Sequence, residues 1–370
     1  MDGPAHRIVH GDPFAYCAHP HLCRVGGALL VVFNKAPRRG FVLHPPEEPL
    51  FANYLTRSDD EGESWSPPVP VPGFGWQGVE CAGLTALGGQ RVMLNQWQFA
   101  WLPLPAARRR PDRERWTMPD RLAAGLAASP EHDWAAPGAP EQLMPWARGD
   151  GASRIHLSDD GGDSWTTVAE LDTRPFVGGY GMRGAVVLDD GTLVLPLCDI
   201  PRYERVFVVR SRDGGMTWEP AIEAAAVPGR LFEEPAPLLL PSGRILLHLR
   251  DNASATLWQT WSDDGGSSWA APEPTGIDGY PAHLLALPDG RLLCTYGFRR
   301  PPFAIRAVLS ADGGRSWDTA PPLTIRDGLP GKDLGYPGSV TLADGTILTV
   351  YYARRDDGTT AVQATRWRLG

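Results

Sequence analysis

The chain alternates short apolar runs with glycine-centred turns along most of its length. Asp190-Gly191 and Asp289-Gly290, for example, each separate two apolar runs of strand length. An Asp-Gly pair between apolar runs is a strong local signal for a β-hairpin, because both central residues of that turn need positive φ. The pattern predicts six hairpins, and their turn glycines are Gly27, Gly89, Gly191, Gly243, Gly290 and Gly345.

A second repeat, Ser-x-Asp-x-Gly-x-(Ser/Thr)-Trp, follows each of the first five hairpins. Its copies are Ser58–Trp65, Ser158–Trp165, Ser211–Trp218, Ser262–Trp269 and Ser310–Trp317. The turn glycine and the repeat tryptophan are 26 or 27 residues apart in the last three copies, but 38 and 76 residues apart in the first two. The first two units therefore carry insertions.

Six hairpins in repeated units of about four strands predict an all-β, six-bladed β-propeller that forms one domain over residues 1–370. We expect a strand near Arg7–His10 to close the ring by pairing with the last blade. The insertion in blade two, at about residues 97–153, contains Arg108-Arg109-Arg110 and a predicted short helix over Pro119–Ala128. It is interpreted as a lid or rim over the mouth of the propeller, with a surface decoration or an oligomer contact as the alternatives.

Strand direction predicts which end of the propeller is functional. If each inner strand runs from the same face to its glycine turn, the residues about eight to ten positions before each turn converge on one mouth of the axis. Convergent polar groups in a concave site indicate ligand binding. These residues are His19, Glu80, Arg183, Glu233, Glu234, Tyr280, His283 and Tyr336.

The loops between second and third strands bring arginines to the same face, and guanidinium groups suit carboxylate, sulfate or phosphate. They are Arg250, Arg299, Arg300, Arg354 and Arg355, with Arg306 on the third strand of blade five.

The repeats and the unit count resemble the sialidase superfamily over nearly the whole chain. The repeats themselves, known as Asp boxes, are interpreted as structural turns. The resemblance implies a tyrosine nucleophile, an assisting glutamate, an aspartic acid as general acid/base and three arginines that hold a substrate carboxylate. Here Tyr336 resembles the nucleophile, Glu234 the assisting glutamate, and Arg250 and Arg306 two of the arginines.

Two departures identify a divergent branch of that superfamily. Ala18-His19-Pro20 stands where the first arginine is expected, so His19 is a candidate ligand contact or proton donor. The loop expected to carry the aspartate, Arg38–Pro49, contains Glu47 and Glu48 but no aspartate.

The leading hypothesis is an exo-acting glycoside hydrolase on a terminal sugar, with an acidic sugar favoured by the arginines. In a second version of this hypothesis, two of Glu80, Glu233 and Glu234 form a catalytic carboxylate pair. A polysaccharide lyase is the first alternative, because His19, His21, His44 and His283 offer bases next to arginines. A non-catalytic carbohydrate-binding propeller is the other.

Composition excludes several other classes. The net charge of −8 argues against a nucleic-acid or anionic-membrane partner, and no apolar stretch approaches the roughly 20 residues that span a bilayer. The histidines have no metal-ligand spacing, so neither a metal nor another cofactor is expected. Five scattered cysteines without a Cys-x-x-Cys pair, together with no signal-peptide pattern in Met1–Val9, predict a cytoplasmic protein with reduced thiols. The oligomeric state is left open.

Overall fold

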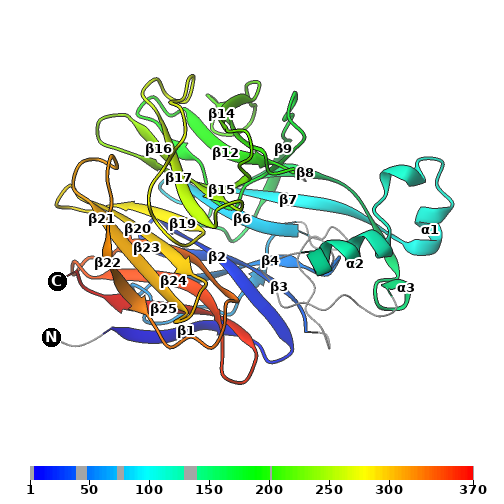
Figure 1. Ribbon diagram of the computed structural model, residues 1–370, viewed down its shortest axis with the longest axis horizontal. Helices are drawn as coiled ribbons and strands as arrows, with labels where there is room; N and C mark the ends of the chain where they lie inside the picture. The colour runs from blue at the N-terminus through cyan, green and yellow to red at the C-terminus, as the bar shows by residue number, and fades with distance from the viewer. Residues whose placement is uncertain (1–3, 39–47, 73–78, 129–139, 201, 370) are drawn as a thin grey trace.

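The computed structural model describes residues 4–38, 48–72, 79–128, 140–200 and 202–369. Its strands form six antiparallel sheets (Figure 1), which confirms the predicted all-β, six-bladed propeller. Neighbouring blades contact one another around the axis, mostly through their inner strands.

Each sheet is built outward from the axis in chain order. Blade one contains β2 (Ala15–Val25), β3 (Ala28–Pro37), β4 (Ala52–Ser58) and β5 (Val69–Pro70). Blade two contains β6 (Val79–Gly88), β7 (Arg91–Pro103), β8 (Trp146–Ser158) and β9 (Thr166–Glu170). Blade three contains β10 (Gly178–Tyr180), β11 (Val186–Val187), β12 (Leu193–Asp199), β13 (Arg205–Ser211) and β14 (Ile222–Ala226).

The second half of the ring follows the same plan. Blade four contains β15 (Phe232–Leu239), β16 (Ile245–Asp251), β17 (Thr256–Ser262) and β18 (Glu273–Pro274). Blade five contains β19 (Ala282–Ala286), β20 (Leu292–Phe298), β21 (Ala304–Ser310) and β22 (Asp318–Arg326). Blade six contains β23 (Leu334–Thr341), β24 (Ile347–Arg354) and β25 (Thr360–Trp367).

The outer strand of blade six comes from the other end of the chain. Strand β1 (Ala5–Gly11) pairs antiparallel with β25, with Ala5 opposite Arg366. The first and last described segments therefore lie side by side on one blade (Figure 1), as the sequence predicted.

The Asp boxes form the turns that join third and fourth strands. In the copy that follows β17, the buried Ser262 hydroxyl donates to Asp264 and accepts the Gly266 N–H, both at 2.8 Å. The other oxygen of the Asp264 carboxylate accepts from the Ser268 hydroxyl at 2.6 Å. The polar residues of the box are therefore used by local hydrogen bonds.

The insertion in blade two continues two strands before it becomes helical. Strands β7 and β8 stay paired as far as Pro103 and Trp146. Between them lie α1 (Leu104–Arg108), a short 3-10 helix (Arg113–Arg115), α2 (Pro119–Ala128) and α3 (Pro140–Leu143), which project to one side of the propeller (Figure 1). In the described part of the chain, no helix is long and apolar enough to cross a membrane.

Candidate active site

The inner strands of blades one, four and six each contain a β-bulge at the same position. His19, Glu234 and Tyr336 lie in the bulges, with φ of 53°, 51° and 53°. Each is followed by a proline, which has no N–H to donate to the ladder. Positive φ at a residue other than glycine costs about 1–3 kcal/mol, and such conformations cluster at functional sites.

The Tyr336 hydroxyl donates a hydrogen bond to Oε1 of Glu234. Both side chains are buried, with 4% and 3% of their surface exposed. The second oxygen, Oε2, accepts from Nη1 of Arg250 at 2.8 Å. Glu234 thus bridges the phenol and a buried guanidinium, and Arg250 also pairs with Glu233 at 3.2 Å.

Burial shifts both members of the Glu234–Arg250 pair toward neutrality. Desolvation raises the pKa of Glu234 to about 7, against the lowering effects of the Tyr336 hydrogen bond and of the Arg299 and Arg183 charges. Desolvation lowers the pKa of Arg250 to about 10, so this arginine stays cationic at neutral pH. The Glu234 carboxyl can therefore exchange a proton near pH 7, as general-base catalysis requires.

Tyr280 lies close to two guanidinium groups. Arg250 is 4.2 Å and Arg299 is 5.2 Å from the centre of its ring, within the range of cation–π attraction. Arg299 is also 5.6 Å from the Tyr336 ring, and its Nε donates to the Leu334 carbonyl at 2.9 Å.

Arg306 lies in a different environment from the one that the resemblance implied. Its guanidinium stacks 3.5 Å from the ring centre of Phe298, and the residue pairs with Tyr296 and Thr324 in the blade-five ladder. The structure therefore brings Arg299, together with Arg250, to the Tyr336 side chain. Arg299 directly follows the second strand of blade five, and this position is the sequence signal that distinguishes it.

His19 packs against the nucleophile candidate at the position of the missing arginine. Its ring is 4.5 Å from that of Tyr336, and its Nδ1 bonds Oδ1 of Asn34 at 3.0 Å. The amide of Asn34 donates to Asn53, so its oxygen faces the histidine and Nδ1 carries the proton. Burial lowers the pKa of His19 to about 3, which keeps the ring neutral at physiological pH.

A second polar group supports this arrangement. Oδ1 of Asp333 accepts from the hydroxyls of Tyr16 and Tyr352 at 3.0 and 2.9 Å. The Tyr352 ring in turn lies 5.1 Å from His19 and 5.8 Å from Tyr336. Burial raises the pKa of Asp333. Sequence reasoning missed Tyr16 and Tyr352 because both lie in apolar strand patterns, and only the phenolic oxygens distinguish them.

Two other predicted site residues line a separate small cavity on the axis. Nη2 of Arg183 donates to the carbonyls of Ala282 and Pro337 at 2.8 and 2.9 Å, and Nδ1 of His283 accepts the Ser339 N–H at 3.3 Å. Arg183 and His283 line that cavity, and the Arg183 charge also lowers the pKa of Glu234.

The remaining candidates are only partly described. Glu80 lies on β6, but its side chain is outside the described structure, as are Glu47 and His44. Glu48 is buried, and its Oε1 accepts the Leu50 N–H at 3.1 Å. Among the described residues, no cluster of three His, Cys, Asp or Glu side chains is placed to hold a metal ion.

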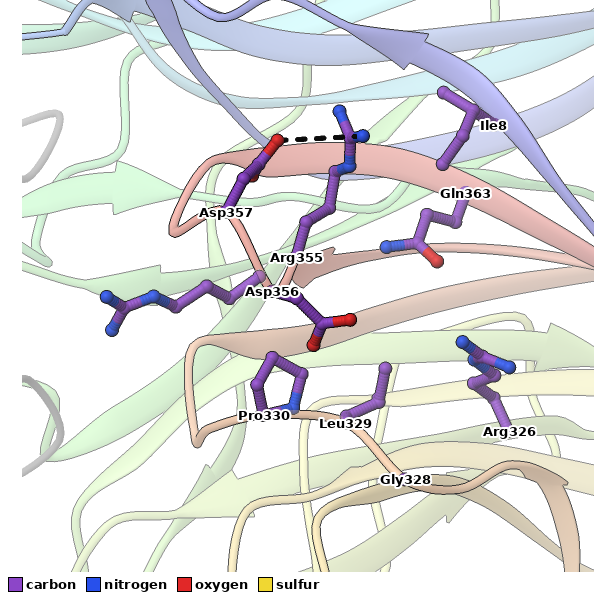
Figure 2. A pocket seen from close by; sticks show the side chains of 10 residues that line it. Ile8, Arg326, Gly328, Leu329, Pro330, Arg355, Asp356, Asp357 and Gln363 are labelled. Atoms are coloured by element: carbon purple, nitrogen blue, oxygen red, sulfur yellow. Dashed lines mark ion pairs between the residues drawn. The ribbon is translucent and has the colours of Figure 1, made fainter.

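Arg354 and Arg355 line a groove of about 370 Å³ between blades five and six, shown in Figure 2. Arg355 is paired with Asp357 at 3.6 Å, and Arg326 and Asp356 complete a mixed-charge lining. Tyr336 and Glu234 are not among the residues lining the groove, so it is distinct from the Tyr336 site.

Comparison with known proteins agrees with this fold. Residues 141–349 match the model of the BNR repeat-like domain. An anhydrosialidase from Macrobdella decora is 33% identical over 125 residues, which are 33% of this chain and 14% of that protein. This chain therefore matches only a small part of that relative.

Solved structures give the same fold. A protein of unknown function from Dyadobacter fermentans superimposes with a TM-score of 0.75 at 21% identity, covering all of both chains. The NanB sialidase of Streptococcus pneumoniae gives 0.67 at 13% identity, covering 98% of this chain and 70% of that one. The chain is thus a sialidase-superfamily propeller. It belongs to the BNR repeat-like domain family.

We predict that Asp333→Ala destabilises the protein by about 2 kcal/mol or more, because two buried tyrosine hydroxyls lose a charged acceptor. Asp333→Asn keeps an acceptor oxygen and should lose less. Denaturant unfolding measures both, with the exposed Asp318→Ala as the control. An Asp333→Ala variant as stable as this control would contradict the structural role given to the carboxylate.

Proposed function

We propose that the protein is an exo-acting glycoside hydrolase that cleaves a terminal acidic sugar of the sialic acid type. One observation carries the proposal: the Tyr336 hydroxyl donates to Glu234, whose other oxygen is held by Arg250. A phenol hydrogen-bonded to a buried carboxylate with a pKa near neutrality is an activated nucleophile. The matched anhydrosialidase and the NanB sialidase support the choice of sugar.

The reaction has two displacements at the anomeric carbon. The Tyr336 oxygen forms a bond to that carbon and gives its proton to Glu234, while the bond to the leaving oxygen breaks and that oxygen takes a proton from solvent water. Water then attacks the anomeric carbon of the glycosyl–tyrosine intermediate and releases one proton to solvent, and the departing phenol takes its own proton back from Glu234. Because Glu234 takes the proton as the bond forms, a free tyrosinate is not required next to an anionic sugar.

The arginines supply the attraction for the sugar carboxylate. Arg250 and Arg299 both lie beside Tyr280, and Arg299 also faces Tyr336. His19 replaces the third cation with a neutral ring. We infer from this replacement that the protein binds the sugar carboxylate with two guanidinium groups. Its other contacts with the sugar would then compensate for the missing third guanidinium.

A carbohydrate-binding propeller without turnover is the second candidate. The neutral His19 ring favours it, because fewer cations face the substrate than the resemblance implies. Saturable binding of sialic acid that is insensitive to Tyr336→Phe, without product formation, would favour this function. A lyase is less well supported, since the low pKa of His19 makes this ring a weak base.

We predict that Tyr336→Phe and Glu234→Gln each lower kcat by about 10²-fold or more, because one removes the nucleophile and the other its base. A panel of chromogenic glycosides that includes sialic and uronic acids measures the activity. Tyr54→Phe, in the outer part of blade one, is the matched control. Wild-type rates in both site variants would eliminate the tyrosine mechanism.

A second prediction concerns pH. Ionised Glu234 is required as the base, so kcat/KM should be low in acid and rise with pH through about 7. His19→Gln should keep this acid limb, because the pKa of His19 is about 3 and the ring does not titrate there. Loss of the limb in His19→Gln would assign the titration to the histidine instead.

The two candidate arginines give a direct comparison. Arg299→Met should weaken binding of an anionic sugar about tenfold or more, since a charge-assisted contact contributes about 1.5–3 kcal/mol. Arg306→Met should stay within about twofold, because that guanidinium stacks on Phe298. Isothermal titration with sialic acid measures both affinities, and a larger effect at Arg306 would reverse the assignment.

A further inference from the structure

A cavity that is smaller than the groove in Figure 2 lies on the propeller axis, beyond the Tyr336–Glu234 pair. Its volume is about 90 Å³, and its lining comes from the inner strands or strand connections of blades one to five. His21 and Ala236, which belong to it, lie two residues after His19 and Glu234 on β2 and β15. The lining residues are His21, Leu84, Arg183, Gly184, Ala185, Ala236, Pro237, His283 and Leu284.

Close packing of blades two and three brings Arg183 to the axis. A Cβ added at Gly83 would lie 2.2 Å from the Arg183 backbone, and one at Gly184 would lie 2.1 Å from the Leu84 carbonyl. Arg183 lies in the segment between β10 and β11, and its carbonyl accepts a hydrogen bond from the Asn95 amide at 3.2 Å. Glycine at both contact points is therefore required for this approach.

The Arg183 guanidinium is held rigidly in that position. Only 2% of its surface is exposed, and Nη2 donates to two main-chain carbonyls, those of Ala282 in blade five and Pro337 in blade six. A buried arginine anchored across three blades is a fixed positive charge on the axis.

The two histidines of the cavity are held in one tautomer. Nδ1 of His21 accepts the Leu84 N–H at 2.8 Å, and Nδ1 of His283 accepts the Ser339 N–H at 3.3 Å. A nitrogen that accepts a hydrogen bond carries no proton, so the proton of each neutral ring is on Nε2. Burial lowers the pKa of both histidines, to about 3 for His283, so both rings stay neutral. Each ring therefore has one N–H donor left for a ligand.

The lining thus combines a fixed cation with hydrogen-bond donors. None of the nine described residues that line the cavity carries a carboxyl group. Water needs acceptors for its own hydrogens as well as donors, whereas an anion accepts from every donor. The other walls are mostly aliphatic, which strengthens the attraction between the guanidinium and a bound charge.

We propose that this cavity binds one small monovalent anion of halide size, held by Arg183, His21 and His283. The anion lies on the axis beyond the Tyr336–Glu234 pair and links residues of three different blades. The site is independent of the proposed glycosidase activity, since it needs neither Tyr336 nor a sugar.

The location is tested with bromide, which scatters X-rays anomalously and replaces chloride. Crystals soaked in sodium bromide should show an anomalous peak within about 3.5 Å of the donor nitrogens of Arg183 or the histidines. Density for water alone in the cavity, with bromide only on the outer surface, would overturn the proposal.

Thermal unfolding tests the site in solution. The wild-type Tm should rise by a few degrees when sodium chloride replaces sodium gluconate at constant ionic strength, because a ligand bound only to the folded state stabilises it. The rise should disappear in His283→Leu and in Arg183→Met, and remain in the control Arg306→Met. Equal shifts in all variants, or stabilisation by phosphate but not by chloride, would contradict a halide site.

If Arg183→Met fails to fold, His283→Leu alone decides the outcome. This variant keeps the guanidinium and removes one neutral donor. A chloride-dependent Tm shift as large as that of the wild type in His283→Leu would exclude the histidine from the site.

Discussion

The arrangement of the site depends on a backbone constraint that occurs in three blades. A bulge with positive φ, followed by proline, changes the course of the inner strand at His19, Glu234 and Tyr336. An extra residue in one strand of a ladder redirects the side chain at the bulge. Tyr336, in one bulge, contacts the Glu234 carboxylate and the His19 ring, which lie in the other two. The rigid blades around the axis maintain a conformation that each local sequence disfavours.

Charge in the centre of the propeller is balanced by pairing and by burial. Glu234 and Glu233 share Arg250, while Arg299 is held by a main-chain carbonyl and by aromatic faces. A buried ion pair contributes little net stability, because desolvation opposes the attraction. Burial raises the pKa of Glu234, whereas the Tyr336 hydrogen bond and the charges of Arg299 and Arg183 lower it. The same balance makes this carboxyl sensitive to any ligand charge that enters the site.

The sequence predicted the propeller, the blade count and the closure by an N-terminal strand, because each depends on local turn chemistry or on a repeat. It also predicted that Tyr336, Glu234 and Arg250 lie close together, since the leading ends of the inner strands and the trailing ends of the second strands share one face. It did not distinguish Arg299 from Arg306. That choice depends on the direction of the Arg306 side chain on β21, and this side chain lies over the Phe298 ring. Nor did sequence reasoning find Tyr16 and Tyr352. Tyr16 donates to Asp333, which is far from it in the sequence, so the sequence pattern gives no sign of this pair. The bulges themselves were not predicted, although the His-Pro, Glu-Pro and Tyr-Pro pairs mark them.

The sheet that carries Tyr336 is assembled from opposite ends of the described chain, with β1 on its outer edge. Its ladder requires contacts between segments more than 300 residues apart, and such contacts are formed late when a chain folds. Five blades can form all their strands before β1 meets β25, whereas the sheet that carries Tyr336 cannot. Separation of β1 from the sheet would leave the backbone N–H and C=O groups of β25 unpaired at the edge. It would also weaken the sheet whose inner strand carries Tyr336. Under the proposed tyrosine mechanism, activity would then require a closed ring, because the last pair of strands to join belongs to the blade that carries Tyr336.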